Sequence, residues 1–226
     1  MRIWAWLIDL LYPRRAVCMG CGDALGLDWD DLCEECRAKL AQNWIGPRMP
    51  GKGMKLDGAA YAHAYPGPAG GMVRNLKYRS AWVLAEGMGA EIARAAEQLR
   101  IGEKFIVTAV PMHPKRLRRR GRNHAELLAR SAAAKLNAEY RELLYRTRNA
   151  PQQARLSVRE RKKNLKDAFA VLPECRELAD GAAVLLIDDV YTTGATAKSC
   201  AEALRSAGAG RVYFAAYALG GGDKRG

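Results

Sequence analysis

From residue 58 onward, short apolar runs alternate with stretches whose apolar positions repeat at helical spacing. The runs predict strands over Gly58–Tyr65, Lys104–Val110, Tyr140–Tyr145, Ala182–Val190 and Arg211–Ala218. The periodic stretches predict helices over Ala69–Tyr78, Trp82–Arg100, Asn123–Leu136 and Ser157–Asn164, and another that follows Val190 and ends at Ser206. The Ala182–Val190 run is of the kind found in strands buried on both faces. Alternating strands and helices predict an α/β fold with a parallel sheet flanked by helices.

The N-terminal part follows a different pattern. Ile3–Leu11 is apolar but shorter than the roughly 18 residues that a membrane span needs. Tyr12–Arg15 follows where a signal peptide would place small residues. We therefore expect a helix packed on the body of a cytoplasmic protein with no membrane span; contact with a membrane surface is the alternative for this helix. A loop rich in Gly and Pro, Gly46–Gly53, precedes the α/β pattern. The expected units are residues 1–45 and residues 55–220.

Four of the six cysteines form two Cys-x-x-Cys pairs with eleven residues between them. They are Cys18, Cys21, Cys33 and Cys36. Four thiolates suit tetrahedral zinc, and with four protein ligands no position is open for a substrate, so the expected zinc is structural. Two disulfides or four free thiols are the alternatives, but nothing in the chain indicates an oxidising compartment. Cys175 and Cys200 stand alone and are predicted to be buried thiols.

Charge is concentrated in one segment. The chain has 37 Lys and Arg against 24 Asp and Glu, a formal net charge of +13. Residues 113–166 contain 17 of these basic residues and 4 of the acidic ones, 17 − 4 = +13, so the rest of the chain balances at 20 against 20. A segment this basic predicts polyanionic partners such as phosphates, pyrophosphate or nucleic acid.

The strand predicted over Ala182–Val190 leads into a set of polar residues. Apolar residues 184–187 are followed by Asp188 and Asp189, and then by a turn that opens a helix. The turn consists of Thr192, Thr193, Gly194, Ala195 and Thr196. Backbone N–H groups, hydroxyls and a helix N-terminus together suit a phosphate monoester, and paired carboxylates can accept hydrogen bonds from two sugar hydroxyls. The segment is neither a P-loop nor a dinucleotide fingerprint.

Residues 184–196 resemble the phosphoribosyl-pyrophosphate (PRPP) motif of type I phosphoribosyltransferases. Over about residues 15–218 the chain is similar to the ComF (GntX-like) branch of that superfamily, which carries an N-terminal four-cysteine zinc module and is linked to competence for DNA uptake. Further matching segments are Tyr65–Pro68, Leu76–Tyr78, Val110–Pro114 with Arg120-Gly121, and Gln153–Asn164 before Ala168-Phe169. The resemblance implies that Asp188 and Asp189 are catalytic acids at the ribose diol, with Mg²⁺, and that Thr192–Thr196 hold the 5′-phosphate of PRPP.

A second basic position follows the strand that stops at Pro111. We expect a short loop there, and the resemblance implies that it binds the pyrophosphate of PRPP. The residues concerned are Met112, His113, Lys115 and Arg116. His113 is either a phosphate donor or a structural residue between two prolines, and the pattern does not decide between the two. Asn123 is expected to cap the helix that follows.

The basic run continues beyond what one pyrophosphate requires. Arg118, Arg119, Arg120 and Arg122 predict either a track for single-stranded DNA or a solvated face. Where relatives have Arg-Gly-Phe-Asn-Gln, this chain has Arg120-Gly-Arg-Asn-His124. The change removes an aromatic residue and adds a positive charge, so the acceptor that relatives use does not transfer to this chain.

These features favour a PRPP-binding, phosphoribosyltransferase-like protein that supports DNA uptake, with single-stranded DNA and other competence proteins as partners. The alternative is an active phosphoribosyltransferase of nucleotide or cofactor metabolism without a DNA role. A nucleic-acid-binding zinc protein with a relic fold is disfavoured, because both acids and the phosphate turn are intact. A lid is expected over residues 149–164.

Overall fold

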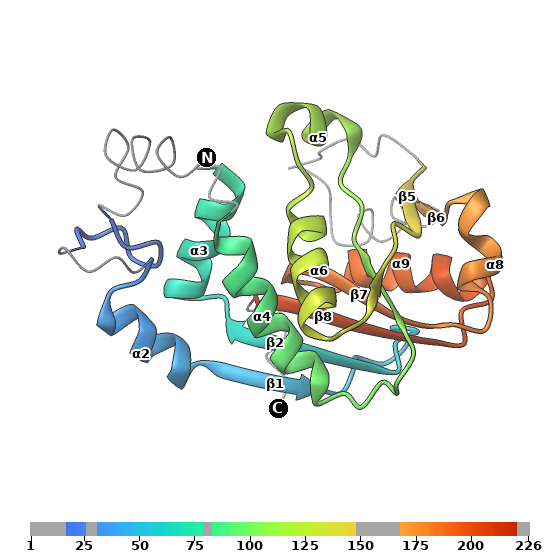
Figure 1. Ribbon diagram of the computed structural model, residues 1–226, viewed down its shortest axis with the longest axis horizontal. Coiled ribbons are helices and arrows are strands. Elements are labelled where there is room, and N and C mark those ends of the chain that lie inside the picture. The colour runs from blue at the N-terminus through green and yellow to red at the C-terminus, as the bar shows by residue number, and fades with distance from the viewer. Residues whose placement is uncertain (1–16, 26–30, 79–82, 148–167, 221–226) are drawn as a thin grey trace.

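The computed structural model describes residues 17–25, 31–78, 83–147 and 168–220 (Figure 1). A six-stranded sheet forms its centre, with the strand order β1-β2-β8-β7-β3-β4. The strands are β1 (Trp44–Arg48), β2 (Gly58–Ala64), β8 (Arg211–Leu219), β7 (Ala183–Tyr191), β3 (Ile106–Ala109) and β4 (Glu139–Tyr140). All neighbours pair in parallel except β1, which runs antiparallel to β2. A separate antiparallel ribbon joins β5 (Leu144–Arg146) to β6 (Phe169–Val171).

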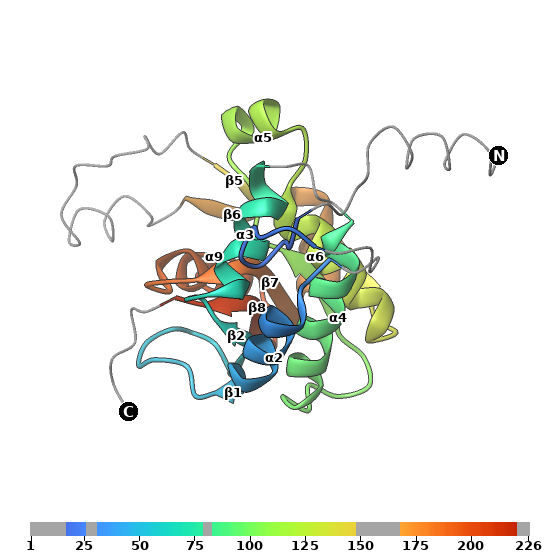
Figure 2. The same ribbon diagram turned by 90° about the vertical axis from the view of Figure 1, so that its left-hand side faces the viewer.

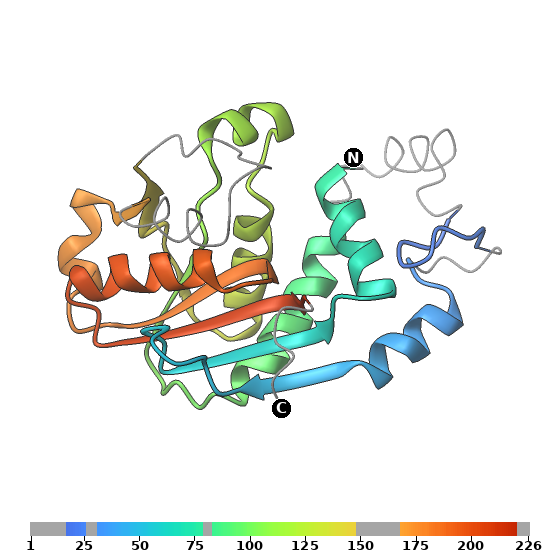
Figure 3. The ribbon, with the colours of Figure 1, turned by 180° about the vertical axis from the view of Figure 1, so that it is seen from behind.

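Helices cover both faces of this sheet. The longer helices are α4 (Leu84–Glu97), α6 (His124–Lys135) and α9 (Ala195–Ser206). Helices α4 and α6 contact each other and pack on one face, against β2, β8, β3 and β7. Figure 3 shows α9 on the opposite face. The expected α/β class, a parallel sheet flanked by helices with an N-terminal four-cysteine module, is therefore confirmed.

Shorter helices occupy the ends of the sheet. They are α2 (Glu34–Gln42), α3 (Pro68–Tyr78), α5 (Pro114–Arg120), α8 (Arg176–Ala179) and the 3₁₀ turn η1 (Pro173–Cys175). Helix α3 lies at the carboxyl ends of β2 and β8, where Tyr65 N donates to Leu219 O at 2.8 Å. Helix α5 projects away from the sheet (Figures 1 and 2). Within the described residues, no helix is long and apolar enough to cross a membrane.

Most predicted elements are confirmed within one to three residues in the described part of the chain. They are β2, β3, β7, β8, α3, α4, α6 and α9. Residues 184–187 in β7 are completely buried, as a strand covered on both faces requires. The helices predicted over Ile3–Leu11 and Ser157–Asn164, and the lid expected over residues 149–164, lie outside the described residues. The division into units of residues 1–45 and 55–220 stays a prediction.

Four expectations were wrong. Gly46 and Pro47 belong to strand β1 rather than to a loop, which is tolerated because β1 is an edge strand. The loop expected after Pro111 is largely helix α5. The strand expected over Tyr140–Tyr145 is two strands in different sheets. Cys200 is fully buried as expected, whereas Cys175 is only partly buried.

The topological switch point of the sheet, called the crevice from here on, lies between β3 and β7. These strands are parallel neighbours, with Ala109 opposite Ile187, and Val110 N donates to Ile187 O at 2.9 Å. From β3 the chain crosses through α6 to β4 on one side, and from β7 it crosses through α9 to β8 on the other. Ligands of such sheets bind beyond the carboxyl ends of the strands where the winding direction reverses. Both sets of residues singled out in the sequence follow these two strands.

Candidate active site at the ends of β3 and β7

The acid pair lies within β7, two residues before its end. Consecutive residues of a strand point to opposite faces, so Asp188 and Asp189 have different surroundings. Asp189 accepts a hydrogen bond from Lys77 Nζ at 2.7 Å, and this ion pair connects β7 to the last turn of α3. Asp188 Oδ1 accepts from Asp189 N at 2.8 Å. The two carboxylates are thus fixed in orientation, one of them by a cation.

Asp188 is the acid whose ionisation is disfavoured. Burial, followed by the negative charge of Asp189, raises the pKa of Asp188 to about 8. The backbone N–H of Asp189 and the more distant Lys77 oppose this shift and only partly compensate for it. An acid with a pKa raised this far at the end of a strand is typical of a functional site rather than of a surface turn.

The turn after β7 forms a small polar cavity. It has a volume of about 40 Å³. Its lining consists of Asp188, Val190 to Ala197 and Phe214. Gly194 has φ +71° at the N-cap of α9, and a side chain there would collide with the Tyr191 hydroxyl. Thr193 Oγ1 accepts from Ala195 N at 3.5 Å. The start of a twelve-residue helix therefore faces this cavity, which suits a phosphate group.

The basic position after β3 begins with a helix cap. His113 Nδ1 accepts from Lys115 N at 3.0 Å, and Pro114 occupies the first helical position. The buried His113 thus has a structural role, and its contact with pyrophosphate stays a prediction. Lys115 and Arg116 are exposed on α5, whereas Met112 is partly buried.

Asn123 occupies the N-cap position of α6, but its side chain makes no capping hydrogen bond. Its Nδ2 instead donates to Val110 O at 3.1 Å. The capping role expected of this side chain was therefore wrong. The contact fixes the start of α6 against the end of β3, beside the crevice.

A contact between side chains connects α5 to the end of α3. The Arg120 guanidinium lies 5.1 Å from the centre of the Tyr78 ring, and its Nη2 donates to Tyr78 Oη at 3.2 Å. Arg120 Nε and His124 Nδ1 are buried with no hydrogen-bond partner. Burial, followed by the charge of Arg120, lowers the pKa of His124. His124 is therefore a neutral imidazole near enough to Asp189 to be influenced by its charge. It stands where the resembling proteins have Gln.

The four arginines predicted as a nucleic-acid track do not lie together. Arg120 turns inward to Tyr78, whereas Arg118, Arg119 and Arg122 are exposed on or directly after α5. Within the described residues, no ion pair neutralises these three side chains. Of the four arginines, these three remain candidates for contacts with a nucleic acid.

Sequence analysis missed one cation of the site. Lys77 appeared only within a segment of family resemblance. The separation of 112 residues between Lys77 and Asp189 leaves no local pattern that pairs them.

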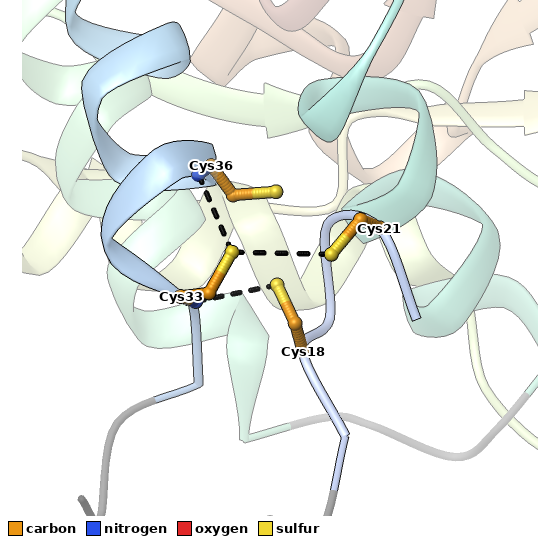
Figure 4. Close-up of side chains that lie close together, drawn as sticks. All are labelled: Cys18, Cys21, Cys33 and Cys36. Carbon is orange, nitrogen blue, oxygen red and sulfur yellow. Dashed lines mark hydrogen bonds between the residues drawn. The ribbon is translucent and has the colours of Figure 1, made fainter. Parts of the chain in front are cut away.

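The four N-terminal cysteines form a cluster that fits a metal ion (Figure 4). Their sulfur atoms all lie within 4.8 Å of one another, and Cys21 Sγ lies 3.9 Å from Cys33 Sγ. Four sulfurs at the usual Zn–S length of about 2.3 Å are about 3.8 Å apart, so the spacing suits tetrahedral zinc. Backbone N–H groups of Cys33 and Gly20 each point to Cys18 Sγ at 3.3 Å. Such N–H···S contacts orient and stabilise thiolate ligands.

The ionisation of the cluster agrees with a bound cation. Burial alone would raise the pKa of Cys18, but the backbone N–H groups around its sulfur lower it to about 6. Burial and the neighbouring sulfurs raise the pKa of Cys36. Ionising Cys36 beside the Cys18 thiolate therefore costs free energy unless a positive ion lies between the two sulfurs. The donor set is all sulfur, which suits Zn²⁺ and not Mg²⁺.

Solved structures that resemble the chain include glutamine PRPP amidotransferase from B. subtilis complexed with ADP and GMP. It is 20% identical with a TM-score of 0.40, and the match covers 57% of this chain and 25% of that one. Another is described as the allosteric regulatory enzyme of purine biosynthesis; it is 21% identical with a TM-score of 0.39, and 58% and 24% are covered. This chain thus spans about a quarter of their length. No family model and no curated protein matches the chain.

Proposed function

We propose that the protein binds PRPP with Mg²⁺ in the crevice between β3 and β7 and is a phosphoribosyltransferase-like protein. The observation that carries this proposal is the convergence of three features at one edge of the sheet. All three lie at the carboxyl ends of two adjacent parallel strands. They are the paired acids Asp188 and Asp189, the small cavity at the start of α9 and the basic residues after β3.

Each part of PRPP has a matching part of the site. Residues 192–196 hold the 5′-phosphate, because the left-handed backbone at Gly194 exposes N–H groups to the cavity. Asp188 and Asp189 accept hydrogen bonds from the two ribose hydroxyls. Met112, His113, Lys115 and Arg116 lie on the pyrophosphate side. Carboxylate oxygens suit Mg²⁺, which would neutralise pyrophosphate charge while it keeps several waters.

Transfer would break the bond between C1 of the ribose and the pyrophosphate oxygen and form a bond from C1 to an acceptor nucleophile, through a cationic sugar comparable to that of glycoside cleavage. The carboxylates at the end of β7 stabilise positive charge on the sugar. The cations after β3 stabilise the negative charge that grows on the departing pyrophosphate. Asp188 serves this purpose only as the ionised form, which its raised pKa makes the minor form at pH 7 in the ligand-free site. A bound cation would favour that ionised form.

Calorimetry with PRPP and Mg²⁺ tests the proposal. Replacing both Asp188 and Asp189 by Ala should weaken binding at least tenfold, about 1.4 kcal/mol. Glu177→Gln, an exposed acid on α8, is the matched control and should bind like the unchanged protein. Equal affinity of the double variant and the control would overturn the proposal. Pyrophosphate release measured across bases, amines and single-stranded DNA then decides whether catalysis is retained.

We further propose a ComF-like role in DNA uptake, with single-stranded DNA and other competence proteins as cytoplasmic partners. The supporting observation is that Arg118, Arg119 and Arg122, on or directly after α5, are exposed and form no ion pair with another described residue. The alternative is a phosphoribosyltransferase of nucleotide or cofactor metabolism. Turnover with a small acceptor, combined with no salt-dependent binding of DNA, would favour that alternative.

A further inference from the structure

A second cavity, of about 410 Å³, lies between α2, α3 and α4 at the carboxyl ends of β2 and β8. Figure 2 shows these three helices beside one another, and α3 contacts both α2 and α4. The volume falls in the range of about 300–1,000 Å³ that is usual for small-molecule sites. None of the residues that line it also lines the cavity at the start of α9. The two cavities are therefore distinct.

The floor of the second cavity is apolar and buried. It consists of Leu40, Met72, Leu84 and Met88, none of which is more than 8% exposed. Flexible methionine side chains adapt to a flat ring, and their sulfur atoms make favourable contacts with aromatic groups. Such a floor suits the apolar body of an organic ligand rather than a sugar or a phosphate.

Gly87 of α4 leaves one side of the second cavity open. Glycine inside a helix is less favourable than alanine. For Gly89, in the same helix, close packing explains the glycine, because a Cβ there would lie 2.5 Å from the Ser131 side chain. A Cβ on Gly87 would meet no atom within 4 Å, and Gly87 is exposed and lines the cavity. Packing within the described chain thus gives no reason for this glycine, whereas a ligand that lies against the helix backbone does.

The carboxylate of Glu91 forms a polar end of the cavity. Its Oε2 accepts from His63 Nε2 at 3.2 Å and from Arg94 Nη2 at 3.2 Å. His63 Nδ1 donates to Leu40 O at 3.0 Å, so both nitrogens of this buried ring face acceptors, which requires the doubly protonated form. The hydrogen bond from His63 lowers the pKa of Glu91, so the carboxylate is ionised at neutral pH. No described residue donates to Glu91 Oε1, which is left as an acceptor for a ligand.

The charges around the second cavity favour an uncharged ligand. A cationic ligand would gain little from Glu91, which is already paired with two cations. An anionic ligand would face both Glu91 and Asp31, which also lines the cavity. The two arginines of the lining are engaged, because Arg94 is paired with Glu91 and Arg37 donates to Leu32 O at 3.1 Å. An uncharged ligand with an N–H group can form a charge-assisted hydrogen bond to Glu91 Oε1 without meeting a like charge.

We propose that the second cavity binds an uncharged heteroaromatic compound that carries an N–H donor. The ring lies on the apolar floor and against the backbone at Gly87, and its N–H donates to Glu91 Oε1. The inference does not rest on PRPP binding, because no lining residue of this cavity belongs to the acid pair, the phosphate turn or the basic position after β3. The bound ligand contacts α2, which carries Cys36 of the cysteine cluster, as well as α4.

Titration of the full chain with indole, followed by NMR, tests the proposal. Indole is uncharged and has one N–H group, whereas benzofuran has the same shape without the donor, so indole should bind at least about tenfold more tightly. Gly87→Leu should weaken indole binding at least about tenfold, because the leucine side chain occupies the space of the ligand, and it should fold normally since a Cβ there meets no atom. Glu97→Leu adds the same side chain at an exposed position of α4 outside the cavity, so its affinity should change less than about twofold.

Glu91→Gln removes the charge of the acceptor and should lower the affinity for indole but not that for benzofuran. If this variant does not fold, Gly87→Leu still decides the outcome, because it leaves the pair of His63 and Glu91 intact. Failure of the unchanged protein to bind indole, equal affinity for the two compounds, or indole binding that survives Gly87→Leu would overturn the proposal. Loss of indole binding in the variant with Asp188 and Asp189 replaced by Ala would place the ligand in the crevice and would also overturn it. Indole binding in a protein that does not bind PRPP would support the second cavity and refute the proposed function alone.

Discussion

Lys77 Nζ lies 2.7 Å from Asp189 Oδ1 and joins the end of α3 to the end of β7. Both side chains are mostly buried, at 22% and 13% exposed. The pair fixes Asp189 beside Asp188, an acid whose burial favours the neutral form. A ligand that approaches Asp189 with hydroxyl groups therefore meets a carboxylate already fixed by a cation.

Replacing Lys77 by Gln should destabilise the fold by about 2 kcal/mol, between the values typical of exposed and of buried pairs. Most of this loss reflects Asp189 left without its cation. Asp189→Asn in the same chain should therefore recover part of the stability, and urea unfolding of the two single variants and the double variant measures the coupling. Additive effects of the two substitutions would show that the ion pair contributes nothing to stability.

Stability should depend on pH through Asp188. Its pKa in the folded protein is raised to about 8 from an ordinary value of 3.8, so the folded state holds the proton more tightly than the unfolded state does. Its contribution to stability is fully present below about pH 4 and is lost as pH rises through about 8. Thermal melting across this range should show a fall that Asp188→Asn lacks. A variant with the same pH profile as the unchanged protein would contradict the shifted pKa.

Metal removal should affect the N-terminal module first. We expect one zinc per chain by elemental analysis and loss of the metal in Cys33→Ser, while the sheet remains folded. Since metal binding contributes folding free energy to small modules, a lower melting temperature should accompany the loss. Cys175→Ser is the control, because Cys175 lies outside the cluster and should leave the metal content unchanged. Protein purified without chelator that contains no zinc or iron would disprove the site.

The exposed face of α5 should contribute to DNA binding through charge alone. Replacing Arg118, Arg119 and Arg122 by Ala should weaken binding of single-stranded DNA and reduce the log–log salt slope by about 0.7 for each phosphate that is no longer neutralised. The control variant replaces Arg94, Arg130 and Arg141 by Ala. It removes the same amount of charge, but from residues that are already paired with acids. Equal weakening by both triple variants would indicate a general charge effect rather than a site on α5.

The parts of the site that follow local rules were predictable from the sequence. The apolar run before Asp188 and Asp189 predicts a buried strand, and the cysteine spacing predicts the cluster. Helix α5 was missed because it has no buried residue, so no apolar periodicity marks it. Only the capping role of His113 indicates where the helix begins. The pairing of Lys77 with Asp189 depends on how distant elements pack, so no local pattern contains it.

Helix α3 contacts both the cysteine cluster and the acid pair. A side chain on Gly71 would collide with Gly20 O, and Asn75 Nδ2 donates to Met19 O at 2.8 Å. Two residues after Asn75, the same helix presents Lys77 to Asp189. Because one helix joins the two sites, we expect loss of the metal to shift Lys77 relative to Asp189.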